Sequence, residues 1–187
     1  IDEIQTGMGR TGKNFCYQYE IEKPDGLMLG KALGGGIYPV SAFLASNEVM
    51  KVFDPGSHGS TFGGNPIAAR IAMEALKILT EDHFADKAHE LGEYLMSRLK
   101  ELNSPHITDV RGKGMLIGVE IDPNMATARE VCLRLKDKGL LCKETHETVV
   151  RFAPPMTITR EELDWAIEQV RTVLAEMDEE YTQKKIA

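Results

Sequence analysis

The chain of 187 residues carries 29 acidic and 22 basic side chains, giving a net charge of −7, and 42% of its residues are hydrophobic. This length and composition predict a globular chain with one substantial core or two small ones. The negative charge argues against a nucleic-acid partner, because the average surface would repel phosphates. No segment reaches the roughly 18–20 apolar residues that span a bilayer, so no membrane partner is expected.

The three cysteines are Cys16, Cys132 and Cys142, and none of them forms a pair at metal-ligand or redox spacing. They therefore predict neither a disulfide framework nor a metal site, and we expect them to be small core residues in a reducing compartment. The chain opens at Ile1 on an acidic, glycine-punctuated turn instead of at a methionine. We therefore expect a fragment of a longer protein.

The first third of the chain is rich in glycine and contains short apolar runs at 27–29 and 40–45. Turn-forming residues bound these runs, which predicts buried strands of an α/β sheet. Asn65 and Pro66 then predict a helix start, because Asn caps free amides and Pro loses no hydrogen bond at the first helical position. The expected apolar face of this helix consists of Ile67, Ile71, Ala75 and Leu79. A second amphipathic helix is indicated by Ala88, Leu91, Leu95, Leu99 and Leu102.

After Pro105 the pattern changes to strand candidates at 115–121, 140–143 and 149–152, with a helical stretch around residues 128–135 between them. Thr159 and Glu162 have capping-box spacing and predict the start of a last amphipathic helix. The polar tail 179–187 is expected to fray.

Lys31 follows an apolar strand candidate, stands between Gly30 and Ala32, and precedes three glycines at 34–36. Ligands of open α/β sheets bind beyond the carboxyl ends of strands, and small neighbours let a bulky group approach the backbone. A desolvated amine in such a place is a competent Schiff-base nucleophile. The alternative is a surface lysine on a loop.

Asp2 opens a second glycine-rich loop, in which Gln5 follows three residues later. An aspartate at the end of a buried strand needs a cationic partner, because an unpaired buried carboxylate is costly. A protonated pyridine nitrogen is one such partner, and that ion pair lets a cofactor ring act as an electron sink. The alternative is a turn-forming aspartate.

Ser60 and Thr61 place two hydroxyls just before the predicted helix start at Asn65. Free amides and the helix dipole favour an anion there, so this loop is a candidate phosphate site. The alternative is a helix start without a ligand.

Arg151 lies inside the apolar run 149–155, where a charge is expensive unless an anion meets it. A carboxylate bound by both guanidinium nitrogens is the natural guest. An internal salt bridge is the alternative. Arg111 is expected to belong to a turn or a domain contact.

Four ordered motifs resemble the class-III pyridoxal-phosphate-dependent aminotransferases, the family that includes ornithine, acetylornithine and 4-aminobutyrate aminotransferases. They are DEIQTGMGRTG at 2–12, LGKALGGG at 29–36, GSTFGGNP at 59–66 and VRGKG at 110–114. Two further stretches, GIYPVSA at 36–42 and VRFAPP at 150–155, are most similar to the ornithine branch. The resemblance implies a fold-type I α/β architecture. Residues 1–80 then belong to the large cofactor-binding domain, 81–104 to a linking helix and 105–187 to a smaller α+β domain.

The same resemblance implies a role for each site residue. Lys31 holds pyridoxal 5′-phosphate covalently and shuttles a proton, and Asp2 pairs with the pyridine nitrogen. Gln5 is implied near the ring hydroxyl, whereas Ser60 and Thr61 reach the cofactor phosphate of the neighbouring subunit in a homodimer. Arg151 takes the α-carboxylate of glutamate or 2-oxoglutarate.

For the ornithine branch, the implied reaction transfers the δ-amino group of L-ornithine to 2-oxoglutarate and gives glutamate 5-semialdehyde and glutamate. The amino-terminal half of such enzymes supplies the phosphate-cradling glycine loop and the aromatic ring stacked on the cofactor, and neither is in this sequence. Acetylornithine or 4-aminobutyrate aminotransferase is the alternative within the family, and a non-catalytic fragment or binding module is the alternative outside it. The expected compartment is the bacterial cytoplasm, with the mitochondrial matrix as the alternative.

Overall fold

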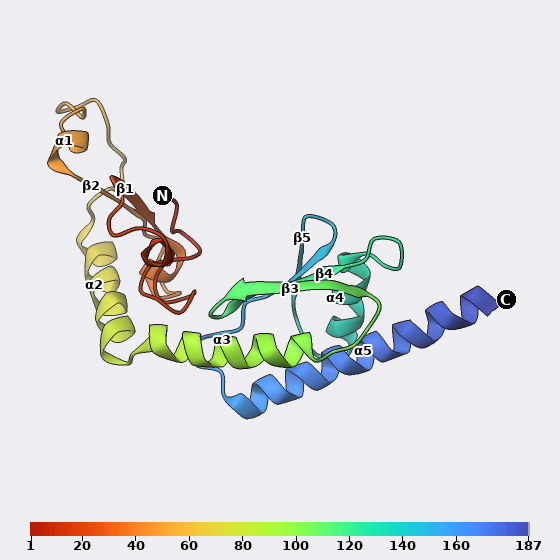
Figure 1. The fold of residues 1–187 in the computed structure, drawn as a ribbon. Coiled ribbons are helices and arrows are strands. Elements are labelled where there is room, and N and C mark those ends of the chain that lie inside the picture. Colours follow the sequence, from red (N-terminus) through yellow and green to blue (C-terminus); the bar gives the residue numbers. More distant parts are fainter. Residues whose placement is uncertain (187) are drawn as a thin grey trace. The chain divides into compact units, whose positions relative to one another are not determined.

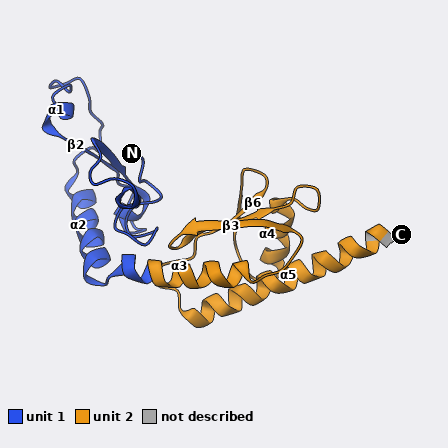
Figure 2. Cartoon of the chain, viewed as in Figure 1, with its two compact units in different colours: residues 1–88 blue, residues 89–187 orange. Residues whose placement is uncertain are grey.

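The computed structural model describes residues 1–186 and divides the chain into two compact units, Ile1–Ala88 and His89–Ala187 (Figure 2). The boundary between the units falls inside helix α3 (Phe84–Lys100). This helix lies within the range 81–104, where the sequence predicts a helix. None of the described helices combines the length and the apolar character needed to cross a membrane.

The first unit consists of short strands and 3-10 turns followed by one long helix (Figure 1). Its elements before α3 are the 3-10 helix η1 (Cys16–Tyr19), β1 (Gly26–Leu29), the 3-10 helix η2 (Lys31–Gly34), β2 (Ala42–Ala45), α1 (Asn47–Met50) and α2 (Pro66–Glu81). The predicted buried strand at 27–29 is confirmed as β1. The run at 40–45 is a strand only in its later part, β2, and the prediction that it is buried is wrong, because Phe43 is 47% and Leu44 50% exposed.

Strands β1 and β2 form an antiparallel pair in which Gly26 lies opposite Ala45 and Leu29 opposite Ala42. Along β1, the side chains of Leu27 and Leu29 are buried, whereas Met28 between them is exposed. This alternation is what a strand produces when one of its faces packs on a core.

Helix α2 begins as its sequence predicts. The amide of Ala68 donates to Asn65 Oδ1 over 2.8 Å, and Pro66 occupies the first turn. The predicted apolar face is only partly confirmed, because Leu79 is buried while the side chain of Ile67 is 62% exposed. The amino-terminal end of α2 therefore presents apolar surface that its own unit does not cover.

The second unit is a four-stranded antiparallel sheet with helices (Figure 1). The strands lie in the order β3-β4-β6-β5. Their bounds are β3 (Ile107–Lys113), β4 (Leu116–Ile121), β5 (Lys143–Thr145) and β6 (Val149–Phe152), and the helices besides α3 are α4 (Ala128–Asp137) and α5 (Arg160–Ile186).

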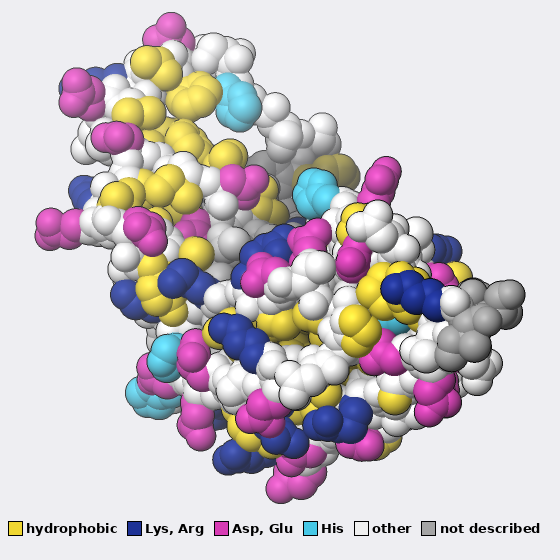
Figure 3. Space-filling view, turned by 45° about the vertical axis from the view of Figure 1, so that its right-hand side comes forward, with side chains coloured by type: hydrophobic (Ala, Val, Ile, Leu, Met, Phe, Trp, Pro, Cys, Tyr) yellow, Lys and Arg dark blue, Asp and Glu magenta, His cyan; other side chains and the backbone are white. Residues whose placement is uncertain are grey.

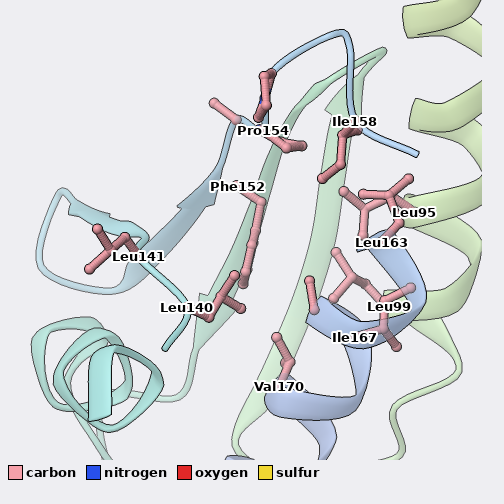
Figure 4. A pocket seen from close by; sticks show the side chains of 13 residues that line it. Leu95, Leu99, Leu140, Leu141, Phe152, Pro154, Ile158, Leu163, Ile167 and Val170 are labelled. Atoms are coloured by element: carbon pink, nitrogen blue, oxygen red, sulfur yellow. The ribbon is translucent and has the colours of Figure 1, made fainter. Parts of the chain in front are cut away.

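The core of this unit lies between one face of the sheet and the helices. Alternate residues of β4 are buried, and Val150 and Phe152 of β6 are buried as well. A small apolar cavity of about 200 Å³ remains where α3, β6 and α5 meet, and its wall includes Leu99, Phe152 and Ile167 (Figure 4). The opposite face of the sheet carries polar residues, so it is the face available to polar ligands.

The capping box at the start of α5 is confirmed. The Thr159 amide donates to Glu162 Oε2 over 2.8 Å, and the Glu162 amide donates to Thr159 Oγ1 over 3.2 Å. The expectation that residues from 179 onward fray is wrong as far as Ile186, because α5 continues to that residue. An ion pair from Arg134 of α4 to Glu180 at 2.7 Å connects this last part of α5 to the unit.

Two other predictions for the second unit differ from the structure. The sequence predicts only a turn or a domain contact around Arg111. The structure instead has strand β3 there, which pairs with β4 over residues 107–113. The predicted strand at 140–143 begins only at Lys143, and Leu141 before it is 82% exposed.

Figure 3 shows Lys or Arg and Asp or Glu side chains interspersed over the displayed face. Exposed ion pairs of this kind contribute little to stability individually.

Candidate active site

Two chain segments run side by side at one edge of the first unit. Asp2 and Met28 form a parallel bridge, in which the Glu3 amide donates to Met28 O over 2.9 Å and the Met28 amide donates to Ile1 O over 3.0 Å. Because the two segments are parallel, the chain leaves both of them at the same edge. This is the edge where α/β proteins bind ligands.

Lys31 lies in the loop that follows β1 at this edge. Its backbone has a φ of 44°, in the left-handed region that L residues other than glycine rarely adopt. Holding a non-glycine residue there costs about 1–3 kcal/mol, so the surrounding structure has to enforce it. The exposed Nζ of Lys31 donates a hydrogen bond to Gln5 Oε1 over 3.1 Å. The structure therefore brings together two of the residues selected from the sequence, and the amine has a defined direction.

The glycines around Lys31 allow close packing of the two loops. A Cβ atom built on Gly30 would lie 3.3 Å from the side chain of Ile4, which is tighter than an ordinary contact. Gly35 has a φ of 59° and ends the 3-10 helix that Lys31 begins. Glycine thus permits the close approach at residue 30 and the left-handed conformation at residue 35 on either side of the lysine.

Asp2 is placed differently from the expectation. Its side chain is exposed in the described chain, and its Oδ1 accepts a hydrogen bond from the Ile4 amide over 2.9 Å. The buried carboxylate of this loop is instead Glu3, which is 1% exposed. The carboxylate of Asp2 is thus accessible to a cationic ligand, whereas that of Glu3 is enclosed by protein.

Glu3 is the site residue that sequence reasoning missed. Its Oε2 accepts from Thr6 Oγ1 over 2.5 Å, and its Oε1 accepts from the Tyr17 amide over 2.6 Å. These bonds close the loop that contains Gln5 and fix its shape. The sequence offered one signal: strand alternation puts Glu3 on the face opposite to Asp2 and Ile4.

Ser60 and Thr61 lie in a separate loop of the first unit, before α2, and both are exposed. A cavity of about 610 Å³ adjoins this loop, and Ser60, Gly64 and Asn65 belong to its wall, although Thr61 does not. A Cβ on Gly63 would lie 2.9 Å from Ser60 Oγ, so a larger residue at position 63 would require the Ser60 hydroxyl to move. The loop can offer hydroxyls and the start of a helix to an anion.

Arg151 lies on β6 of the second unit. Its Cα partners are Gly118 on β4 and Lys143 on β5, and its side chain is half-buried on the polar face of the sheet. Within residues 1–186, the guanidinium has no hydrogen-bond or ion-pair partner, so the internal salt bridge considered from the sequence is not formed there. Gly118 beside it adds no side chain, and a Cβ built there would lie 3.0 Å from Val149 Cγ1.

Arg111 occupies the same cross-strand row as Arg151, because Gly118 pairs with both residues. Arg111 donates to Asp109 over 2.8 Å and to Glu120 over 2.7 Å. The hydrogen bond to Asp109, followed by that to Glu120, raises the pKa of Arg111 above its ordinary value. Arg111 is therefore engaged within the sheet, and Arg151 is the arginine of this row that is free to bind a ligand.

Comparison with known proteins gives the same family for nearly the whole chain. The model of the class-III aminotransferases matches residues 1–174. The chain is 54% identical over 173 residues to the ornithine aminotransferase of Halalkalibacterium halodurans, covering 92% of this chain and 43% of that protein. The ornithine aminotransferase of Bacillus subtilis is also 54% identical, with 92% and 42% covered. The chain thus spans less than half the length of these relatives.

Solved structures agree with this assignment. An ornithine δ-aminotransferase of Plasmodium falciparum superposes with a TM-score of 0.92 at 44% identity, covering 96% of this chain and 48% of that chain. An acetylornithine aminotransferase of Elizabethkingia anophelis gives a TM-score of 0.87 at 46% identity, with 93% and 44% covered. The fold is therefore that of part of a fold-type I enzyme.

Enzymes of this class depend on pyridoxal phosphate, which needs a primary amine for its attachment. The exposed amine of Lys31 meets this requirement, because it lies at a ligand-binding sheet edge with one side-chain partner, Gln5. The accessible carboxylate of Asp2 belongs to the neighbouring parallel segment. These observations and the comparisons agree that the chain belongs to the class-III aminotransferase family.

Proposed function

We propose that the full-length protein is an ornithine aminotransferase that transfers the δ-amino group of L-ornithine to 2-oxoglutarate and yields glutamate 5-semialdehyde and glutamate. The observation that carries the proposal is the backbone of Lys31, held in a left-handed conformation with its amine directed to Gln5. Strained residues of this kind concentrate at functional sites. The names of the relatives support ornithine as the amino donor.

Each site residue of this chain has one task in the proposed reaction. Lys31 holds the cofactor through its Nζ and then moves a proton to and from the substrate carbon that bears the amino group. Asp2 would pair with the pyridine nitrogen and keep it protonated. Gln5, which accepts a hydrogen bond from Lys31 Nζ, would lie near the ring hydroxyl. When bound, pyridoxal phosphate supplies an electron sink for the bond that breaks. Proximity of the amine to the carbon is the main contribution of the protein to this proton transfer.

Arg151 binds the α-carboxylate of glutamate or 2-oxoglutarate. Its guanidinium has no partner among the described residues, so a bound carboxylate does not have to displace an internal ion pair. A carboxylate held by two guanidinium N–H groups is also fixed in orientation. Arg151→Lys is therefore expected to raise the KM for 2-oxoglutarate, because an ammonium lacks the planar pair of donors.

Covalent attachment of the cofactor tests the proposal. The purified full-length protein is expected to be yellow, and borohydride reduction should fix the cofactor on the tryptic peptide that contains Lys31. Lys31→Ala should remove both the attachment and the transamination while the far-ultraviolet circular dichroism is retained. Lys77→Ala is the matched control, because Lys77 is an exposed lysine of the same unit on α2. Turnover by the Lys31→Ala protein at the parental rate would refute the assignment.

The amino donor is a separate question, because an acetylornithine aminotransferase is also a close structural match at 46% identity. Comparison of kcat/KM for L-ornithine, N-acetylornithine and 4-aminobutyrate, with 2-oxoglutarate as the acceptor, distinguishes the possibilities. A preference for either of the latter two amines assigns the protein to that branch. A protein without a cofactor band and without borohydride-fixed cofactor would be the non-catalytic alternative.

The proposed enzyme is a cytoplasmic homodimer in which Ser60 and Thr61 reach the cofactor phosphate of the other subunit. Exposed apolar side chains in the first unit support a covering partner, among them Ile37 at 80%, Phe62 at 76% and Ile67 at 62%. Mixing experiments test the shared site. Subunits with Lys31→Ala and subunits with Ser60→Ala and Thr61→Ala should regain activity when refolded together, because one site of each hybrid dimer is then intact. Absence of any recovery in confirmed hybrid dimers would exclude sharing.

A further inference from the structure

Two cysteines that are ten residues apart in the sequence lie in contact in the second unit. Cys132 lies on α4, and Cys142 directly precedes β5. Their sulfur atoms are 3.4 Å apart, with the Cys142 thiol donating to Cys132 Sγ, and both cysteines are free. The spacing of the two cysteines does not predict this contact, because the contact arises only when the turn after α4 folds the chain back onto the helix.

The surroundings of the pair favour reaction at Cys132. Its side chain is buried, while that of Cys142 is half-buried. The hydrogen bond from Cys142 lowers the pKa of Cys132, although burial and the negative charge of Glu144 act against it, and the positive charges of Arg129 and Lys143 contribute in the lowering direction. The same hydrogen bond and burial raise the pKa of Cys142. One sulfur is thus favoured as the thiolate and the other as the thiol, which is the pairing that disulfide formation requires.

We propose that Cys132 and Cys142 form a redox modification site that closes to an intrachain disulfide when a hydroperoxide is the oxidant. Bond formation requires the sulfurs to approach from 3.4 Å to about 2.05 Å. Because α4 and β5 already pack against each other, the two sulfurs are held close together before oxidation.

The chemistry balances with hydrogen peroxide as the two-electron oxidant. The Cys132 thiolate attacks one peroxide oxygen, the O–O bond breaks, and Cys132 sulfenic acid and hydroxide are formed. The Cys142 thiol then attacks the Cys132 sulfur. The S–O bond breaks, the S–S bond forms, and water leaves with the thiol proton. Both sulfurs are oxidised and one peroxide is reduced.

The bond would tie helix α4 to the residue directly before β5. Lys143 follows Cys142 directly and is the Cα partner of Arg151 on β6. The modification site is therefore covalently adjacent to the strand pair that carries the unpaired arginine.

Thiol mapping of the purified full-length protein tests the proposal. The protein is reduced with dithiothreitol, freed of the reductant, treated with hydrogen peroxide, denatured in N-ethylmaleimide and digested. Before oxidation, Cys16, Cys132 and Cys142 should all be alkylated. After oxidation, the peptides of Cys132 and Cys142 should be linked. The mass of the linked pair should be lower by two hydrogen atoms than the sum of the two unalkylated peptides, while Cys16 stays alkylated. Dithiothreitol should restore the first pattern.

Two variants make the test specific. Cys142→Ser should abolish the link and leave a sulfenic acid on Cys132 that dimedone traps. Cys16→Ser is the matched control and should form the same link as the parent. Both thiols remaining alkylated after oxidation would overturn the proposal, as would a dominant link from either of them to Cys16 or to another chain.

Discussion

Replacement of Gly92 by alanine tests the packing of the second unit most directly. Gly92 lies on α3, where a Cβ would come within 2.2 Å of Gly114 O and 2.5 Å of Gly114 Cα. Gly114 belongs to the turn between β3 and β4 and has a φ of 53°. Both partners are backbone, so relief requires the helix and the sheet to separate by about 1 Å, which damages a close-packed core.

Two opposing effects determine how much Gly92→Ala changes the free energy of unfolding. Alanine improves helix propensity by about 1 kcal/mol relative to glycine. Overpacking costs about 1–3 kcal/mol, and contact between backbones belongs at the upper end because neither group can rotate away. We therefore expect a net loss of about 2 kcal/mol, which for a full-length protein more than twice as long as this chain corresponds to a Tm lower by about 2–4 °C.

Differential scanning calorimetry of the full-length protein measures this loss. Gly59→Ala is the matched control, because no atom lies within 4 Å of its added Cβ and its φ is not in the left-handed region. The control should melt at or slightly above the parental temperature. A Gly92→Ala protein as stable as the control would show that α3 does not pack on the β3–β4 turn in this way.

Two further substitutions address the first unit. Glu3→Gln should destabilise the protein by about 1–3 kcal/mol. The carboxylate accepts hydrogen bonds from Thr6 and Tyr17 on its two oxygens, and the NH₂ group that replaces one of these oxygens cannot accept. An unchanged urea midpoint would contradict the role given to Glu3. Asn65→Ala should cost about 1 kcal/mol through loss of the cap on Ala68, whereas Asn65→Asp retains an acceptor and should melt close to the parent. Equal melting of the two variants at position 65 would refute the capping argument.

The parts of the fold that follow from local chemistry could be predicted from the sequence. The cap at Asn65, the capping box at Thr159 and the alternation along 116–121 each depend on residues within a few positions of one another. Such signals survive without knowledge of the rest of the chain. Lys31 and Gln5 were likewise selected from motifs, Gln5 as a neighbour of the ring hydroxyl, and their side chains lie in contact.

The features that were missed depend on tertiary contacts. Strand β3 contains Gly112 and charged residues, and only its pairing with β4 identifies it as a strand. The tail of α5 is polar, yet an ion pair from Arg134 of α4 reaches it at Glu180. The burial of Glu3 in place of Asp2 likewise depends on hydrogen bonds from residues that follow it in the chain.

The parallel bridge between Asp2 and Met28 makes the position of Gln5 sensitive to sequence changes at a distance from Lys31. A slip of one residue between the two segments would turn every side chain of one segment to the opposite face, and Gln5 would no longer meet Lys31. Insertions or deletions in the connection between residues 6 and 25 that disturb this alignment should therefore behave like active-site lesions, although they change no catalytic group.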